Sequence, residues 1–175
     1  MHVAAWELLE EVGFEQLQLP VVADRAQVNK TTVYRRWPTR VDLVADLMDS
    51  FTRINVADPD SGSFRGDLEA LLGAIASALS SRAIRSVLRS GTEAAERDAQ
   101  IREAQKAFWE RRFELSGVIV ERAIASGELP YGTDPRAVLE MAAGPVYFRA
   151  LFTADPLDAP FLEDVVVRTV RAFAS

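Results

Sequence analysis

The sequence contains no cysteine and only one histidine, His2. This scarcity removes disulfides, thiolate chemistry, structural zinc and nearly every catalytic arrangement built on histidine. Long apolar runs are also missing, since none approaches the roughly 18 to 20 residues of a membrane span. Residues 1–12 carry three glutamates and no lysine or arginine, unlike a signal peptide. We therefore expect a cytoplasmic protein without a metal, a cofactor or a membrane partner.

At 175 residues the chain is long enough for one large domain, or for a small domain joined to a larger one. Its formal net charge of -6 argues against a protein that coats nucleic acid without regard to sequence, because such a binder needs excess positive charge. Positions 25 to 40 nevertheless hold five basic residues and no acidic one: Arg25, Lys30, Arg35, Arg36 and Arg40. A basic patch on an acidic chain is typical of site-specific binding confined to one element.

Apolar residues recur at helical spacing along almost the whole sequence, and no stretch alternates with a period of two. We therefore expect an all-α fold of about nine helices. The predicted helices cover residues 3–12, 19–26, 30–37, 39–54, 68–79, 84–88 and 96–126, and two more begin after Asp134 and Asp158. Glycine and proline mark several helix ends and starts, at Gly13, Pro38, Gly127, Pro135 and Pro160.

The segment from about Leu17 to Trp37 predicts a helix, a turn and a second helix that can enter a major groove. At 100° per residue, Val33 and Trp37 share one apolar face of the second helix, which should be buried. Thr31 and Arg35 then point nearly the opposite way, where Arg pairs with guanine and Thr meets a base edge. The predicted DNA contacts are Lys30, Thr31, Thr32, Tyr34, Arg35, Arg36 and Arg40, with Lys30, Tyr34, Arg36 and Arg40 assigned to phosphates. Spacing alone fits a solvated polar helix face equally well.

Three stretches near the N-terminus resemble the DNA-binding domain of the TetR family in order, spacing and residue type. They are residues 4–14 (AAWELLEEVGF), 22–28 (VADRAQV) and 29–40 (NKTTVYRRWPTR), followed by Leu43. Shorter stretches are similar to the last helices of one large TetR subgroup: GELP at 127–130, DP at 134–135, GPVYFR at 144–149 and DPLD at 155–158. The resemblance implies a DNA-binding domain over residues 1–45 and a ligand-binding and dimerisation domain over residues 46–175.

The sequence departs from the family pattern in three places. Gln18 and Pro20 replace the polar cap and the following residue that usually open the second helix, which puts a phosphate contact there in doubt. Gln27 stands where the turn usually has glycine, which should cost some stability without changing the topology. The family usually has a short, often basic arm before the first helix, and Met1 lies inside that region.

The resemblance also implies that the C-terminal helices form a dimer interface and a ligand cavity. Two chains are expected to form a four-helix bundle through Val138, Ala142, Ala143, Val146, Ala150, Phe161, Val165, Val166, Val170 and Phe173. The predicted pocket is apolar with a few polar groups, and its residues are Leu47, Met48, Phe51, Phe108, Trp109, Arg112, Phe113, Tyr147 and Phe148. Plain core packing stays open as the alternative for every residue in both sets.

The leading interpretation is a repressor that binds double-stranded operator DNA as a homodimer and responds to a small apolar effector. An all-helical carrier of small molecules without DNA function is the alternative, and the basic patch argues against it. An enzyme is disfavoured, because the sequence has no cysteine, one histidine and no Glu-x-x-His pair of the kind used by di-iron bundles.

Overall fold

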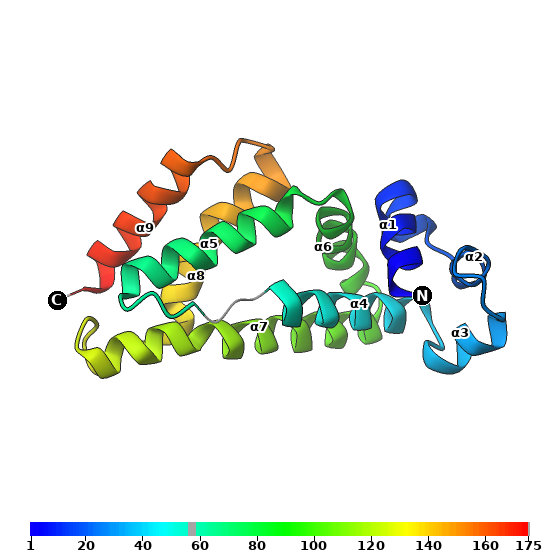
Figure 1. The fold of residues 1–175 in the computed structure, drawn as a ribbon, viewed down its shortest axis with the longest axis horizontal. Coiled ribbons are helices and arrows are strands. Elements are labelled where there is room, and N and C mark those ends of the chain that lie inside the picture. Colours follow the sequence, from blue (N-terminus) through cyan, green and yellow to red (C-terminus); the bar gives the residue numbers. More distant parts are fainter. Residues whose placement is uncertain (56–58, 175) are drawn as a thin grey trace. The chain divides into compact units, whose positions relative to one another are not determined.

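The computed structural model describes residues 1–55 and 59–174, and for residues 51–55 it describes the helical backbone alone. These residues form α-helices and one π-helical segment without any β-strand, so the predicted all-α fold is confirmed (Figure 1). In chain order the helices are α1 (His2–Gln16), α2 (Leu19–Arg25), α3 (Lys30–Arg36), α4 (Arg40–Asn55), α5 (Phe64–Ser80), α6 (Arg82–Ala95), α7 (Ala99–Ser126), α8 (Pro135–Phe148), η1 (Arg149–Thr153) and α9 (Ala159–Phe173). Within the described residues no single helix has the length and apolar composition of a membrane span, although α5 and α6 taken together meet that test.

Side-chain caps explain where the predicted helices begin. Thr39 and Asp42 cap α4 reciprocally: the Thr39 hydroxyl accepts the Asp42 N–H at 3.2 Å, and the Asp42 carboxylate accepts the Thr39 N–H at 2.9 Å. Asp134 accepts the amide two residues later at the start of α8, and Asp158 accepts the amide three residues later at the start of α9. Each bond satisfies an amide that has no partner inside the helix, and the predicted starts are confirmed.

Three helices differ from their predicted bounds because of caps that the apolar pattern does not reveal. Ser63 accepts the Gly66 N–H at 3.2 Å at the start of α5, which begins at Phe64 rather than at residue 68. Ser81 accepts the amide three residues later at 3.3 Å and opens α6, which is much longer than the predicted residues 84–88. Asp98 accepts the Gln100 N–H at 2.8 Å, so that α7 begins after this residue rather than at residue 96.

The chain divides into two compact units, residues 1–53 with 81–109 and residues 54–80 with 110–175. In the first unit α1 packs against α2 and α6, and α2 packs against α3. Its apolar core includes Leu9, Val22, Val33, Leu43 and Leu47, all inaccessible to solvent. The predicted division into residues 1–45 and 46–175 concerns function and stays a prediction.

Gly13 ends the regular part of α1. Its φ of 75° lies in the left-handed region, so residues 14–16 form a separate turn after the break. The Phe14 N–H that follows donates to the Ser86 hydroxyl of α6 at 3.2 Å. A Cβ on residue 13 would lie 3.0 Å from that same hydroxyl, so both the conformation and the space favour glycine. The predicted stop at this position is confirmed.

In the second unit α5, α8 and α9 pack against one another (Figure 1). The apolar side chains that close this core are fully buried and include Leu68, Leu72, Ile119, Val138 and Val146. Pro145 lies inside α8, and a few residues later the chain changes to the π-helical turn η1, which ends at Ala154 in the left-handed conformation. This end of α8 is therefore irregular.

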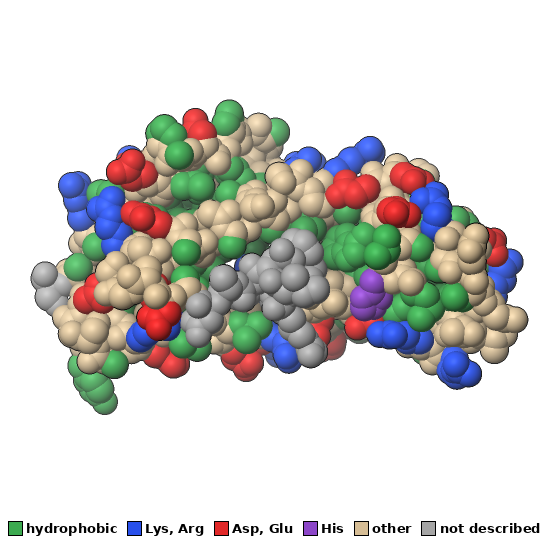
Figure 2. Space-filling view, in the orientation of Figure 1, with side chains coloured by type: hydrophobic (Ala, Val, Ile, Leu, Met, Phe, Trp, Pro, Cys, Tyr) green, Lys and Arg blue, Asp and Glu red, His purple; other side chains and the backbone are tan. Residues whose placement is uncertain are grey.

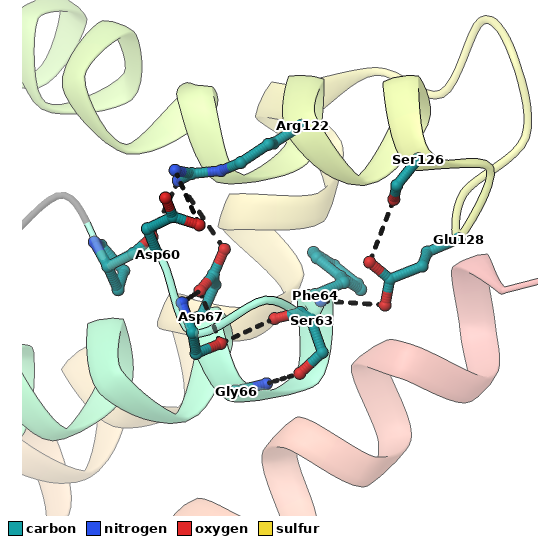
Figure 3. Close-up of polar contacts among 10 residues, drawn as sticks. Asp60, Ser63, Phe64, Gly66, Asp67, Arg122, Ser126 and Glu128 are labelled. Carbon is teal, nitrogen blue, oxygen red and sulfur yellow. Dashed lines mark hydrogen bonds and ion pairs between the residues drawn. The ribbon is translucent and has the colours of Figure 1, made fainter.

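A buried carboxylate anchors the start of α5 to α7 (Figure 3). Asp67 is only 3% exposed and accepts hydrogen bonds from the Ser61 N–H at 2.8 Å and from the Ser61 hydroxyl at 2.7 Å. The guanidinium of Arg122 on α7 lies 3.7 Å from the second oxygen of Asp67 and 3.6 Å from Asp60, and it donates to the Pro59 carbonyl at 2.8 Å. We call Asp60, Ser61, Asp67 and Arg122 the α5 clasp.

Candidate nucleic-acid interface

The recognition helix α3 has one buried and one exposed face. Val33 is inaccessible to solvent, and Trp37, the C-terminal cap of α3, is 2% exposed, whereas Thr31 and Arg35 are exposed. The Asn29 side chain accepts the Thr31 N–H at 2.8 Å and so caps this seven-residue helix at its start. The predicted orientation of the two faces is confirmed, and it leaves the side chains suited to base edges on the open side.

The turn between α2 and α3 keeps its geometry without glycine. Gln27 adopts a φ of 53°, in the left-handed region that a residue with a Cβ enters only at a cost. The next amide, of Val28, donates back to the Ala23 carbonyl at 3.0 Å and closes the turn. At the start of α2, Gln18 makes no side-chain capping bond, which agrees with the departure noted in the sequence.

Two cations on α3 are open to solvent. In the part of the chain that the structure describes, Lys30 and Arg35 are exposed and have no hydrogen-bonding or ion-pair partner. Tyr34 is 46% exposed, and Thr32 is half-buried. Lysine and arginine side chains are visible on the surface around α2 and α3 (Figure 2). An open guanidinium and ammonium on one short helix suit contact with bases and phosphates.

Arg25, by contrast, is held by α1. Its guanidinium forms two hydrogen bonds of 2.8 Å to the Glu11 carboxylate and lies 3.6 Å from Glu7. The hydrogen bond from Arg25 lowers the pKa of Glu11, and the hydrogen bond to Glu11 raises the pKa of Arg25. This arginine therefore ties α2 to α1, although it is one of the five basic residues at positions 25 to 40.

Arg40 was predicted to contact phosphate, and the structure gives its guanidinium a different set of partners. It donates to the carbonyls of Phe14 at 3.1 Å and Glu15 at 2.5 Å, and it lies 4.5 Å from the centre of the Phe14 ring. Both carbonyls belong to the turn that follows the break at Gly13, which lies 27 positions before Arg40 in the chain. Helical periodicity places Arg40 beside α3 but contains no information about that turn.

Arg36 contacts both the ring of the buried Trp37 and a carboxylate of α4. Its guanidinium is 4.8 Å from the centre of the Trp37 ring and 3.4 Å from Asp46. Asp46 also accepts the Trp37 indole N–H at 2.8 Å and lies 3.1 Å from the His2 imidazole. Partial burial raises the pKa of Asp46, but the hydrogen bonds from Trp37 and His2 and the nearby Arg36 together outweigh this, so the net pKa is lowered.

Sequence reasoning missed Asp46. A signal for it exists, because a buried indole N–H requires an acceptor and tryptophan rarely enters a core without one. The sequence offers several carboxylates near Trp37 and does not distinguish among them.

The predicted pocket residues are divided between the two units. In the first unit Leu47 and Met48 are buried, and the half-buried rings of Phe108 and Trp109 meet edge to face with centroids 5.1 Å apart. Phe51 lies outside the residues whose side chains the structure describes.

In the second unit Tyr147 is half-buried beside Arg112. Burial raises the pKa of its phenol, and the hydrogen bond and charge of Arg112 offset part of that rise. The Phe113 ring is covered by the Arg136 guanidinium, 4.5 Å from its centre. Phe148 is 56% exposed and stacks on Phe152, which is 77% exposed, so this pair belongs to the surface of the single chain.

The residues predicted for the dimer interface separate into two groups. Six are buried inside one chain and pack in its core: Val138, Ala142, Val146, Ala150, Val165 and Val166. The other four are half-buried: Ala143, Phe161, Val170 and Phe173. The apolar surface that α8 and η1 leave open is formed instead by Met141, Phe148 and Phe152. The apolar pattern of a helix is the same whether the helix that covers it belongs to its own chain or to another. For this reason the sequence predicted one interface for both groups.

Comparisons with known proteins match both the N-terminal helices and the C-terminal helices of the chain. Residues 3–47 match the family model described as bacterial regulatory proteins, tetR family, and residues 58–169 match the tetracyclin repressor-like C-terminal domain. The chain is 28% identical over 170 residues to the HTH-type transcriptional regulator YdeS of Bacillus subtilis, covering 96% of this chain and 85% of that protein.

Two solved structures extend the comparison. The TetR family transcription regulator SCO0332 superimposes with a TM-score of 0.82 at 27% identity, covering 99% of this chain and 96% of the other. The transcriptional regulator FadR from Bacillus subtilis, solved in complex with stearoyl-CoA, has the same fold with a TM-score of 0.71 at 19% identity, covering 99% of this chain and 96% of the other.

Proposed function

The chain belongs to the TetR family of bacterial regulatory proteins, and on that premise we propose that it is a repressor that a small apolar effector releases from its operator. A dimer that occupies an operator blocks polymerase in the simplest way, which favours repression over activation. The proposal has three parts: base reading by α3, pairing of two chains, and coupling of effector binding to DNA binding.

One observation carries the DNA-binding part of the proposal. Thr31 and Arg35 lie exposed on α3, opposite the buried Val33 and Trp37, and Arg35 has no partner among the described residues. Arginine binds guanine through two parallel hydrogen bonds, and this is the commonest specific contact in a major groove. Lys30 and Tyr34 flank these residues and suit phosphates.

A binding titration on the DNA upstream of the protein's own gene tests this assignment. Arg35→Ala should weaken operator binding by about 1 to 3 kcal/mol and reduce the preference for the operator over scrambled DNA. Arg168→Ala is the matched control, because Arg168 is an exposed arginine on α9 whose guanidinium forms an ion pair of 2.9 Å with Asp164. Unchanged affinity and preference in Arg35→Ala would show that α3 does not read bases through this residue.

We propose that the second chain packs on the open apolar surface of α8 and η1, formed by Met141, Phe148 and Phe152. Two-fold pairing would make the operator an approximate palindrome, with half-sites set by the spacing of the two recognition helices. Phe148→Glu should give a monomer in light scattering, because it places an unpaired charge in the interface. Tyr131→Glu, at a side chain 99% exposed in the loop before α8, is the control and should leave the dimer intact.

We propose that α4 couples effector binding to DNA binding. This helix begins at Arg40, just after the recognition helix, and the buried Leu47 and Met48 lie at its middle. A displacement of the middle of α4 would tilt α3 through the short joint at Trp37 and Pro38. FadR of Bacillus subtilis, solved with stearoyl-CoA, illustrates an apolar chain held by a protein of this fold.

Calorimetry with a long-chain acyl-CoA as the first probe, with and without operator DNA, tests the coupling. A coupling free energy of about 1 to 3 kcal/mol would change operator affinity by about 5- to 150-fold, and the operator must weaken effector binding by the same factor. Equal effector affinities in the two titrations would exclude coupling through α4.

A further inference from the structure

We propose that Asp46 is a positioning residue for DNA recognition: it holds the recognition helix through Trp37 and withholds Arg36 from phosphates. The inference rests on DNA binding by α3 and adds to it a residue on α4. Four side chains carry it, His2, Arg36, Trp37 and Asp46, and all lie in the first unit.

The first step concerns the attachment of α3. With seven residues the helix is too short to be stable alone, so neighbouring helices set its orientation. Val33 and Trp37 supply the apolar contact, which is non-directional. In the described part of the chain, the side-chain hydrogen bonds that join α3 and its C-terminal cap to another helix all end on Asp46. A directional bond of 2.8 Å from a buried indole sets a rotation that apolar packing leaves loose.

The second step concerns the strength of that bond. The indole N–H of Trp37 is buried with its side chain, and its acceptor is an ionised carboxylate whose pKa is lowered. Hydrogen bonds to charged acceptors are about twice as strong as neutral ones, and a buried donor without an acceptor pays its full desolvation cost. The bond therefore opposes any rotation of α3 that would separate Trp37 from α4.

The third step concerns charge. Asp46 lies 3.4 Å from the Arg36 guanidinium, which is also over the Trp37 ring, while Lys30 and Arg35 on the same helix have no protein partner among the described residues. An arginine paired with a carboxylate has less to gain from a phosphate. The count of phosphates that the protein neutralises is then set partly by Asp46, and the salt dependence of binding measures this count directly.

Two substitutions separate the two roles. Asp46→Asn keeps an oxygen that can accept the indole N–H and removes the charge that holds Arg36. Operator preference over scrambled DNA should be retained, and the slope of log affinity against log salt should steepen by about 0.9 per protomer, the value for one more phosphate contact. Asp46→Ala removes both, and should in addition weaken operator binding about tenfold and lower the preference, as expected for the loss of one hydrogen bond to a charged acceptor.

Further variants test the route of each effect. Trp37→Phe removes the indole donor and should lower operator preference as Asp46→Ala does. Asp46→Asn combined with Arg36→Ala should return the salt slope to the wild-type value. Asp164→Asn removes a carboxylate from the exposed Arg168 pair on α9, and should change neither slope nor preference. Thermal unfolding of each variant, with DNA binding measured well below the midpoint, keeps loss of folded protein from mimicking loss of affinity.

The outcomes separate the roles proposed for Asp46 from the proposed function of the protein. Wild-type protein that binds no specific DNA would overturn the proposed function itself. Specific binding by the wild type, with loss of preference in Arg35→Ala but a wild-type salt slope in Asp46→Asn, would overturn the withholding of Arg36. Unchanged operator preference in folded Asp46→Ala would overturn the positioning role.

Discussion

The arginine on the open face of α3 is free to contact DNA, whereas three other arginines of the same basic stretch are bound to groups of the protein. Arg35 has no partner among the described residues, whereas Arg25 is bound by Glu11, Arg36 by Asp46, and Arg40 by two backbone carbonyls. All of these belong to one basic stretch of sequence. The comparison teaches that a count of charges locates a nucleic-acid interface, while the partners of each charge decide which cations remain available to DNA. The predictions below test three held cations and the turn before α3, from the largest expected effect to the smallest.

A held cation outside the basic stretch is Arg122 of the α5 clasp. Asp67→Ala removes a carboxylate that is 3% exposed, and with it the hydrogen-bond acceptor of Ser61 and an ion-pair partner of Arg122. The free energy of unfolding should fall by about 3 kcal/mol, near the lower end of the range for breaking a buried pair because Arg122 is partly exposed. Urea denaturation followed by circular dichroism measures this. A loss below about 1 kcal/mol would mean that the α5 clasp contributes no more to stability than an exposed salt bridge.

Arg40 should behave as a structural residue. Arg40→Ala removes two charged hydrogen bonds to the carbonyls after Gly13, and the free energy of unfolding should fall by about 2 kcal/mol. Both bonds come from one nitrogen, Nη1, so Arg40→Lys can restore part of them, but it loses the planar guanidinium that lies over the Phe14 ring and should recover only part of the loss. Full recovery of stability by lysine, together with full DNA affinity, would instead assign Arg40 to phosphate contact.

Gln27 provides a smaller test with the opposite sign. Gln27→Gly should raise the free energy of unfolding by up to about 1 kcal/mol, because glycine adopts a φ of 53° without the penalty of a Cβ. The gain is reduced by the greater freedom of glycine in the unfolded chain. Operator affinity, measured in parallel, should stay unchanged. A destabilised variant would mean that the Gln27 side chain contributes more than its backbone costs.

The smallest effect is expected at Arg25. Its guanidinium is exposed and already paired with Glu11 and Glu7, so Arg25→Ala should leave operator affinity and the salt slope as in the wild type. Lys30→Ala, which removes an unpaired cation of the same stretch, should flatten the slope by about 0.9 per protomer. Equal slopes in these two variants would remove the distinction between held and open cations.

Local chemistry predicted much of the fold. Helix starts at Thr39, Asp134 and Asp158 follow from caps within three residues, and Val33 and Trp37 are buried as the helical period requires. The start of α6 was missed because the prediction began at the apolar residue Ile84 and did not recognise Ser81, three residues earlier, as its cap. The left-handed turn at Gln27 shows that the topology tolerates a residue whose local preference opposes it.

What the sequence by itself determined is therefore the set of helices, their apolar faces and the helix that carries the open Thr31 and Arg35. Such features depend on residues at most a few positions apart, where the helical backbone geometry decides which side chains are neighbours. The tertiary structure alone decided that Arg40 binds carbonyls 25 and 26 positions away, that Asp46 accepts from Trp37, and that Val138 and Ala142 pack inside one chain. These contacts join separate helices, and a helical period records which face a residue occupies but not which helix will cover it.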